Sequence, residues 1–210
     1  IFDSNVMGDA HSSFVATDNK EGGRIGGRQL AKLLGGEGRV MLMRYVQGTG
    51  STEARADGFL EIAKQENLPV GVDVYPETGT VEGCKNGAAN ALQGFVDDGK
   101  LELDGIFACN LYSTLGVASA LDDLRKGGVT VDLKFVGFDT STKLVRLLQA
   151  GEIDALVAQN PQKMGRLAVE TLHKVVNGET VPDMVDTGVA LVTAEALEAD
   201  PAMRKLVGLE

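Results

Sequence analysis

Gly105-Ile106-Phe107-Ala108-Cys109, which is followed by Asn110, is one of three stretches of the same kind in this chain. The other two are Lys134-Phe135-Val136-Gly137-Phe138, followed by Asp139, and Asp154-Ala155-Leu156-Val157-Ala158, followed by Gln159. Each is a short, largely apolar run that ends at a hydrogen-bonding residue. Such a run predicts a strand buried on both faces of a sheet. Because parallel strands end at one edge, where open α/β sheets bind ligands, the three polar residues predict a binding crevice.

Helices and strands alternate along the rest of the chain. The sequence predicts strands at residues 13–16, 39–43, 69–74, 105–109, 132–138, 155–158 and 186–192. It predicts helices from a cap at 17 or 18 to 34, then at 51–65, 81–96, 112–124, 141–150 and 161–176, with a polar helical tail from 194. Strands separated by helices of this length are joined by right-handed crossovers. The predicted fold class is therefore α/β, with a doubly wound parallel sheet.

Composition and charge exclude several classes of partner. The 210-residue chain has a formal net charge of −10, which disfavours nucleic acid and anionic membrane surfaces. No apolar run approaches the length of a membrane span, so direct membrane insertion is not expected. The two histidines and two cysteines form no metal-ligand pattern, and we expect neither a metal nor a cofactor. Cys109 lies in a predicted core strand, where a buried thiol is expected and a disulfide with Cys84 is the alternative.

The polar residues at the strand ends have two interpretations. Asn110, Asp139 and Gln159 each precede a predicted helix, so each could be an N-cap. Three such residues at successive strand ends favour a shared role instead, and Asp3 adds a fourth. Arg55, one turn into a helix, is either a surface arginine or a donor that faces the crevice. The set suits sugar hydroxyls, because carboxylates accept hydrogen bonds, arginine donates them and carboxamides do both.

No catalytic constellation competes with a binding role. The turn Gly48-Thr49-Gly50-Ser51-Thr52 lacks the lysine of a phosphate-binding P-loop, so a plain strand-to-helix turn is favoured. Serine, histidine and acid residues are not arranged as a triad, and no nucleophile elbow is present. Asp3 and Asp139 could imitate the two acids of a glycosidase, but no further feature of the sequence supports that role. We therefore expect a binding protein with no catalytic residues, and not an enzyme.

Several short motifs follow one another in the order and spacing of a known family. They are Phe2-Asp3-Ser4, Ala16-Thr17-Asp18-Asn19 with Gly22-Gly23-Arg24, Gly48-Thr49 through Arg55 to Gly58-Phe59, Ile106-Phe107-Ala108-Cys109-Asn110, Val136-Gly137-Phe138-Asp139, and Ala158-Gln159-Asn160-Pro161 with Met164-Gly165. Together they make the chain resemble a type I periplasmic sugar-binding protein of the ribose-binding kind. The resemblance implies a periplasmic protein that binds a monosaccharide between two Rossmann-like α/β lobes. Such a protein closes on the sugar by a hinge motion and presents it to an ABC transporter permease or a chemoreceptor.

The resemblance also implies which residues bind the sugar and how the chain divides. The implied ligand contacts are Asp3, Arg55, Asn110, Asp139 and Gln159. The implied segments are 1–17 from the N-terminal lobe and first crossover, 18–159 as the C-terminal lobe, 160–185 as a helix of the N-terminal lobe, and 186–210 as a crossover strand and tail. The opening βαβα segment of the first lobe has no counterpart in the chain. We therefore expect an N-terminal part to be absent and that lobe to be incomplete.

Two departures from the family pattern bear on specificity. Ser4 stands where ribose binders carry arginine, and Gly79 stands where an aromatic residue of the second lobe is expected, with Tyr112 as a substitute apolar wall. The alternative function is the effector-binding domain of a lac-repressor-type transcription regulator, which shares the fold. The segment 155–161 and the acidic charge favour the transport protein over the regulator.

Overall fold

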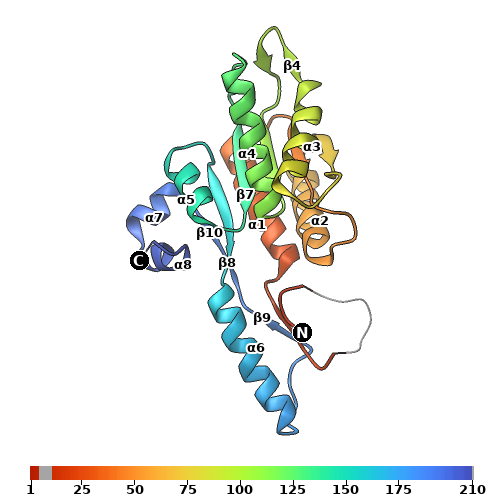
Figure 1. The fold of residues 1–210 in the computed structure, drawn as a ribbon, viewed down its shortest axis with the longest axis vertical. Coiled ribbons are helices and arrows are strands. Elements are labelled where there is room, and N and C mark those ends of the chain that lie inside the picture. The colour runs from red at the N-terminus through yellow and green to blue at the C-terminus, as the bar shows by residue number, and fades with distance from the viewer. Residues whose placement is uncertain (5–10, 210) are drawn as a thin grey trace.

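A six-stranded sheet forms the centre of the computed structural model, which describes residues 1–4 and 11–209 (Figure 1). Its strands, in spatial order, are β10 (Val189–Val192), β8 (Ala155–Gln159), β7 (Lys134–Phe138), β6 (Gly105–Ala108), β2 (Val40–Met43) and β3 (Val70–Val74). Neighbouring strands from β8 to β3 are parallel, whereas β10 pairs antiparallel with β8. The predicted parallel sheet therefore has one antiparallel strand, at this edge.

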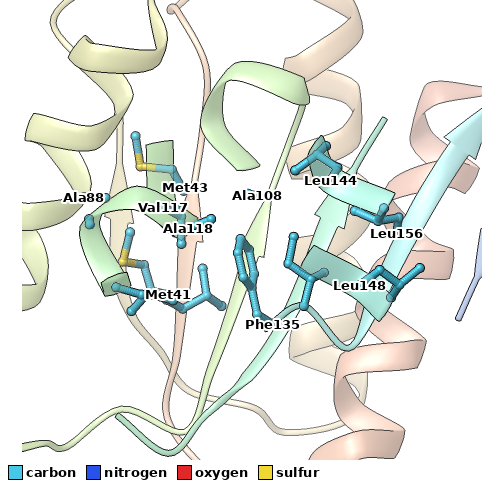
Figure 2. Close-up of a cluster of buried hydrophobic side chains, with 14 of the residues drawn as sticks. Met41, Met43, Ala88, Ala108, Val117, Ala118, Phe135, Leu144, Leu148 and Leu156 are labelled. Carbon is cyan, nitrogen blue, oxygen red and sulfur yellow. The ribbon is translucent and has the colours of Figure 1, made fainter. Parts of the chain in front are cut away.

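Helices cover both faces of this large sheet. They are α1 (Asn19–Leu34) and α2 (Gly50–Gln65) on one face, and α3 (Val81–Gln93), α4 (Leu111–Lys126) and α5 (Thr142–Gln149) on the other. Alternate strand residues supply the two cores: Val40 and Leu42 of β2 join the first, and Met41 and Met43 join the second. Figure 2 shows the second core, where side chains from the strands meet those from α3, α4 and α5. Burial on both faces explains why the inner strands β2, β6, β7 and β8 are largely continuous apolar runs.

A smaller set of elements, which we call the small part, lies beyond one end of the large sheet (Figure 1). β1 (Phe14–Ala16) pairs in parallel with β9 (Met184–Asp186), and Phe2 bridges to Val15. The helix α6 (Pro161–Val176) contacts β1. The chain passes between the small part and the large sheet at three connections, namely Thr17-Asp18, Asn160 and Thr187-Gly188. The short helices α7 (Ala194–Ala199) and α8 (Pro201–Leu206) follow β10 and pack on the second core.

Two further expectations about the elements are wrong. The predicted strand 186–192 is two strands in different sheets, because the chain turns at Gly188, whose φ of 81° favours glycine. The predicted helix 81–96 ends at Gln93, and β4 (Val96–Asp97) then pairs with β5 (Lys100–Leu101) in a hairpin. Asp98-Gly99, with φ of 42° and 73°, provides the turn. An Asp-Gly pair is a strong signal for a two-residue hairpin.

The described residues also bear on the cysteines, on membrane-crossing helices and on metal ligands. Cys84 and Cys109 are both free and buried, so the disulfide alternative is wrong. Burial raises the pKa of the Cys109 thiol to about 12, which is consistent with an inert core thiol. None of the helices in the described ranges is both long and apolar enough to cross a membrane. The described His, Cys, Asp and Glu side chains form no group of three or more that could hold a metal ion.

Candidate functional site

Arg55 is placed by an unusually close crossing of two helices. A Cβ atom on Gly23 of α1 would stand 1.9 Å from the carbonyl oxygen of Arg55, and one on Gly58 of α2 would stand 2.0 Å from that of Lys20. Only glycine permits backbones to approach this closely. The crossing brings the Arg55 side chain beside Asn19, the first residue of α1.

The guanidinium of Arg55 is buried among two hydrogen-bond acceptors, an aromatic ring and a carboxylate. Its Nε donates to Oδ1 of Asn19 at 2.9 Å, and its Nη1 donates to the carbonyl oxygen of Cys109 at 3.0 Å. Its central carbon lies 3.8 Å from the centroid of the Phe138 ring, which is a cation–π distance. Nη1 also lies 3.7 Å from Oδ2 of Asp139. Within the described part of the chain, Nη2 makes no hydrogen bond and is left to donate to a ligand.

Burial and neighbouring carboxylates act on the charge of Arg55 in opposite directions. Arg55 as a whole is only 4% exposed, and this burial lowers the pKa of the guanidinium from its ordinary value. The carboxylates of Asp139 and Asp3 oppose that shift and favour the charged form. A guanidinium with an unused donor can donate to an acceptor group such as a hydroxyl oxygen.

Asp139 and Gln159 form a second pair at the strand ends. Asp139 accepts from the backbone N–H of Leu111 through Oδ2 at 2.9 Å, and from Nε2 of Gln159 through Oδ1 at 2.6 Å. Helix α5 is capped by Ser141 and helix α6 by Asn160. The N-cap interpretation is therefore wrong for both Asp139 and Gln159.

Asn110 is an N-cap and still keeps a donor for a ligand. Its Oδ1 accepts from the N–H of Ser113 at 2.9 Å, and the two residues form a capping box at the start of α4. Its Nδ2 makes no hydrogen bond to any residue that the structure describes. The capping role and a ligand-binding role use different atoms, so both interpretations of this residue are compatible.

Asp3 stands apart from the other four predicted site residues. It is exposed and belongs to the small part, where its N–H donates to the carbonyl oxygen of Val15 at 3.0 Å. Its carboxylate acts on Arg55 through its charge. The structure therefore brings Arg55, Asp139 and Gln159 close together with Asn110 at the same edge of the sheet, and leaves Asp3 in the small part.

Two residues of the site were not identified from the sequence. Asn19 appeared in the sequence only as the last residue of the motif at 16–19, and its contact with Arg55 depends on the helix crossing. Phe138 ends an apolar run, so the sequence indicates a core residue. It is fully buried, and its ring also contacts the guanidinium of Arg55. The only sequence signal for either was its place next to a connection or a strand end.

An aromatic pair lies at the same edge of the sheet. Tyr45 stacks on Tyr112 with ring centroids 5.8 Å apart, and its hydroxyl donates to the carbonyl oxygen of Gly79 at 2.9 Å. A Cβ on Gly79 would stand 2.5 Å from that hydroxyl. Tyr45 therefore occupies the space that a side chain at position 79 would need. Tyr112 is 43% exposed, and its role as an apolar wall stays a prediction.

Comparison with known proteins identifies the family. Residues 1–180 match the periplasmic binding protein domain. The chain belongs to this family. The ribose import binding protein RbsB of Escherichia coli K12 is 29% identical over 183 residues, which are 87% of this chain and 58% of that protein. The family match confirms the predicted α/β fold of a type I periplasmic sugar-binding protein, with one lobe incomplete.

Solved structures agree with this assignment. A carbohydrate transporter solute-binding protein from Agrobacterium radiobacter, in complex with D-arabinose, is 33% identical with a TM-score of 0.85. A solute-binding protein from Agrobacterium vitis with bound D-fucose is 30% identical, also with a TM-score of 0.85. Each comparison covers 98% of this chain and 69% of the solved chain. The chain spans about 58% of the length of its Escherichia coli relative, and these relatives are binding proteins.

Proposed function

We propose that the protein containing this chain binds a monosaccharide at the strand-end site and is not an enzyme. The observation that carries the proposal is the buried guanidinium of Arg55, which has an unused Nη2 donor and lies 3.7 Å from the Asp139 carboxylate. A donor and an acceptor side by side suit a pair of sugar hydroxyls, because each hydroxyl can both accept and donate. Relatives that bind ribose, D-arabinose and D-fucose support this class of ligand.

Each residue of the site has a distinct role in this proposal. Arg55 donates through Nη2 and Asn110 through Nδ2, while Asp139 and Asp3 accept from hydroxyls. Gln159 fixes the orientation of Asp139 through the hydrogen bond at 2.6 Å and offers its own oxygen to the ligand. In a cleft from which water is excluded, each of these contacts discriminates strongly, because an unpaired partner is costly.

The division of the chain fits a cleft between two lobes. In this proposal residues 18–159 form the C-terminal lobe, residues 1–17 and 160–185 belong to the N-terminal lobe, and 186–210 contain the last crossover and the tail. Asp3 then faces Arg55 from the opposite lobe. A sugar that touches both lobes stabilises the closed form, so closure is a hinge motion selected by the ligand.

The relatives also suggest a place of action. The Escherichia coli relative is an import binding protein, and the Agrobacterium radiobacter structure is of a transporter component. We infer that the protein works outside the cytoplasm, in the periplasm, and delivers its sugar to an ABC transporter permease. A chemoreceptor is a second partner in the same proposal.

Calorimetric titration of the whole protein that contains this chain tests the site. The panel is D-ribose, D-arabinose, D-allose and D-fucose. We expect one of them to bind, and Arg55→Ala or Asp139→Ala to weaken that binding by about a hundredfold or more, because each removes charged hydrogen bonds. Arg125→Ala, at an exposed position on α4, is the matched control and should bind as the unaltered protein does.

Folding is monitored in the same samples by thermal unfolding. Both site variants should still unfold cooperatively in the absence of sugar, because neither Arg55 nor Asp139 belongs to the two hydrophobic cores. Unchanged affinity in both variants would refute the site assignment. A protein that binds none of the four sugars would refute the proposal for this ligand class.

A further inference from the structure

Asn19 joins the Arg55 side chain to the first connection between the small part and the large sheet. Its Oδ1 accepts from Nε of Arg55 at 2.9 Å, and its Nδ2 donates to the carbonyl oxygen of Thr17 at 3.1 Å. Asn19 is 8% exposed and Thr17 is fully buried, so both hydrogen bonds are shielded from water. Breaking either one leaves a buried polar group without a partner.

The first connection is bound in turn to the third. The N–H of Thr187 donates to the carbonyl oxygen of Ala16 at 2.9 Å, and the N–H of Asp18 donates to Oδ1 of Asp186 at 3.2 Å. Thr17 and Thr187 are both buried, with their hydroxyl oxygens 3.4 Å apart. A displacement of Thr17 therefore alters contacts at the third connection.

The second connection has a similar arrangement. Gln159, which donates to Oδ1 of Asp139 at 2.6 Å, is the last residue of β8 and directly precedes Asn160. Gln159 is also paired with Val189, just beyond the third connection. Arg55 thus contacts the carboxamide of Asn19, next to the first connection. Asp139 contacts the carboxamide of Gln159, next to the second.

We propose that Asn19 is a positioning residue that couples the sugar site to the connections. It orients the guanidinium of Arg55 and ties it to Thr17, so that a ligand on Arg55 changes the hydrogen bonding between the first and third connections. The identity of the ligand as a sugar rests on the proposed function. The guanidinium is a rigid plane, so a ligand that accepts a hydrogen bond from Nη2 and shifts it also shifts Nε. The carboxamide of Asn19, which accepts from Nε, then moves with it. A ligand shifts a conformational equilibrium only through contacts that differ between states, and this link provides such a contact.

Two substitutions separate the two hydrogen bonds of Asn19. Asn19→Asp keeps an acceptor for Arg55 and removes the donor to Thr17, and a carboxylate is favourable in the first turn of a helix. Asn19→Ala removes both hydrogen bonds. Asn90→Asp, at an exposed position on α3, makes the same change of charge and is the matched control.

Hydrogen exchange at the Thr187 amide measures the contact between the first and third connections. In the whole protein without sugar, we expect Asn19→Asp and Arg55→Ala each to speed this exchange by about threefold or more, since a weakened link opens more often. The Asn90→Asp control should not change it. In the unaltered protein, saturating sugar should slow the exchange, and this slowing should be lost in Asn19→Asp. A merely structural role for Asn19 would leave the sugar-induced slowing in place.

Affinity completes the test. Asn19→Ala should bind the sugar about tenfold more weakly, because Arg55 loses a buried partner. Unchanged Thr187 exchange in Asn19→Asp and Arg55→Ala overturns the coupling. Reduced affinity in Asn19→Ala, together with unchanged exchange at the Thr187 amide in Asn19→Asp, also overturns the coupling. That result would mean that Asn19 only orients Arg55. If the unaltered protein binds no sugar of the panel, the proposed function fails, whereas the sugar-free exchange rates still decide the coupling.

Discussion

At the scale of single residues, the backbone of Asp139 is as constrained as its carboxylate. Its φ of 70° lies in the left-handed region, which costs most residues about 1 kcal/mol or more and costs glycine little. Asp3, its proposed counterpart across the cleft, has a φ of 67°. Both acids therefore have a backbone conformation that residues with a Cβ atom rarely adopt. A strained backbone at two members of one site is typical of functional positions.

This strain predicts that glycine at position 139 gives a more stable protein than alanine, which is the reverse of the usual order in a helix. Asp139→Gly and Asp139→Ala lose the same contacts, but only glycine relaxes at this φ. We expect Asp139→Gly to exceed Asp139→Ala in free energy of unfolding by about 1 kcal/mol, measured by urea denaturation without sugar. Asp57 is an exposed helical position on α2. There we expect the opposite order, with the free energy of unfolding of Asp57→Ala about 1 kcal/mol above that of Asp57→Gly. The same order at both positions would contradict the strain at Asp139.

The site residues differ in how far the sequence could predict them. Asp139 and Gln159 could be found because strand ends in a parallel sheet share one edge, which is a rule of topology. Their hydrogen bond to each other follows from β7 and β8 being neighbours. Asn19 could not be found, because its contact with Arg55 depends on the distance between two helices. Periodicity predicts which face of a helix is buried and not how closely its backbone approaches another.

At the scale of elements, the crossing of α1 and α2 decides where Arg55 lies. We expect Gly23→Ala to lower the free energy of unfolding by about 1–3 kcal/mol, because its Cβ would overlap the Arg55 carbonyl oxygen and force the helices apart. Sugar affinity should fall as well, since Arg55 would move away from Asn19. Thermal and urea unfolding with titration of the folded variant provide both measurements.

A second glycine provides the control for that prediction. Nothing lies within 4 Å of a Cβ placed on Gly165 of α6, so Gly165→Ala should stabilise the protein by up to about 1 kcal/mol through helix propensity. Equal effects of the two substitutions would mean that the helix crossing is not tightly packed. The sequence shows glycine at both positions, and only the three-dimensional arrangement separates a packing glycine from an open one.

At the scale of the whole molecule, the small part is much less covered than the large sheet. The large sheet has helices on both faces, and its strands read as the apolar runs from which the fold was predicted. In the small part, Val169, Leu172 and Val176 of α6 are 68%, 60% and 75% exposed. Val169 and Leu172 line a groove together with Phe2 and Val15. The sequence predicted an incomplete lobe through a resemblance, whereas the exposed helix face follows from the position of α6 against a two-stranded sheet.

This exposed face predicts how residues 1–210 behave when produced on their own. An apolar helix face beside an open sheet edge favours association, because burial of each large aliphatic side chain contributes about 1.5–3 kcal/mol. We expect sedimentation velocity to show a concentration-dependent rise in mass. Leu172→Lys with Val176→Lys should shift the chain toward monomer, whereas Gln162→Lys with His173→Lys, at exposed polar positions of the same helix, should not. A chain that stays monomeric at all concentrations, or associates equally in both double variants, would show that this face is not adhesive.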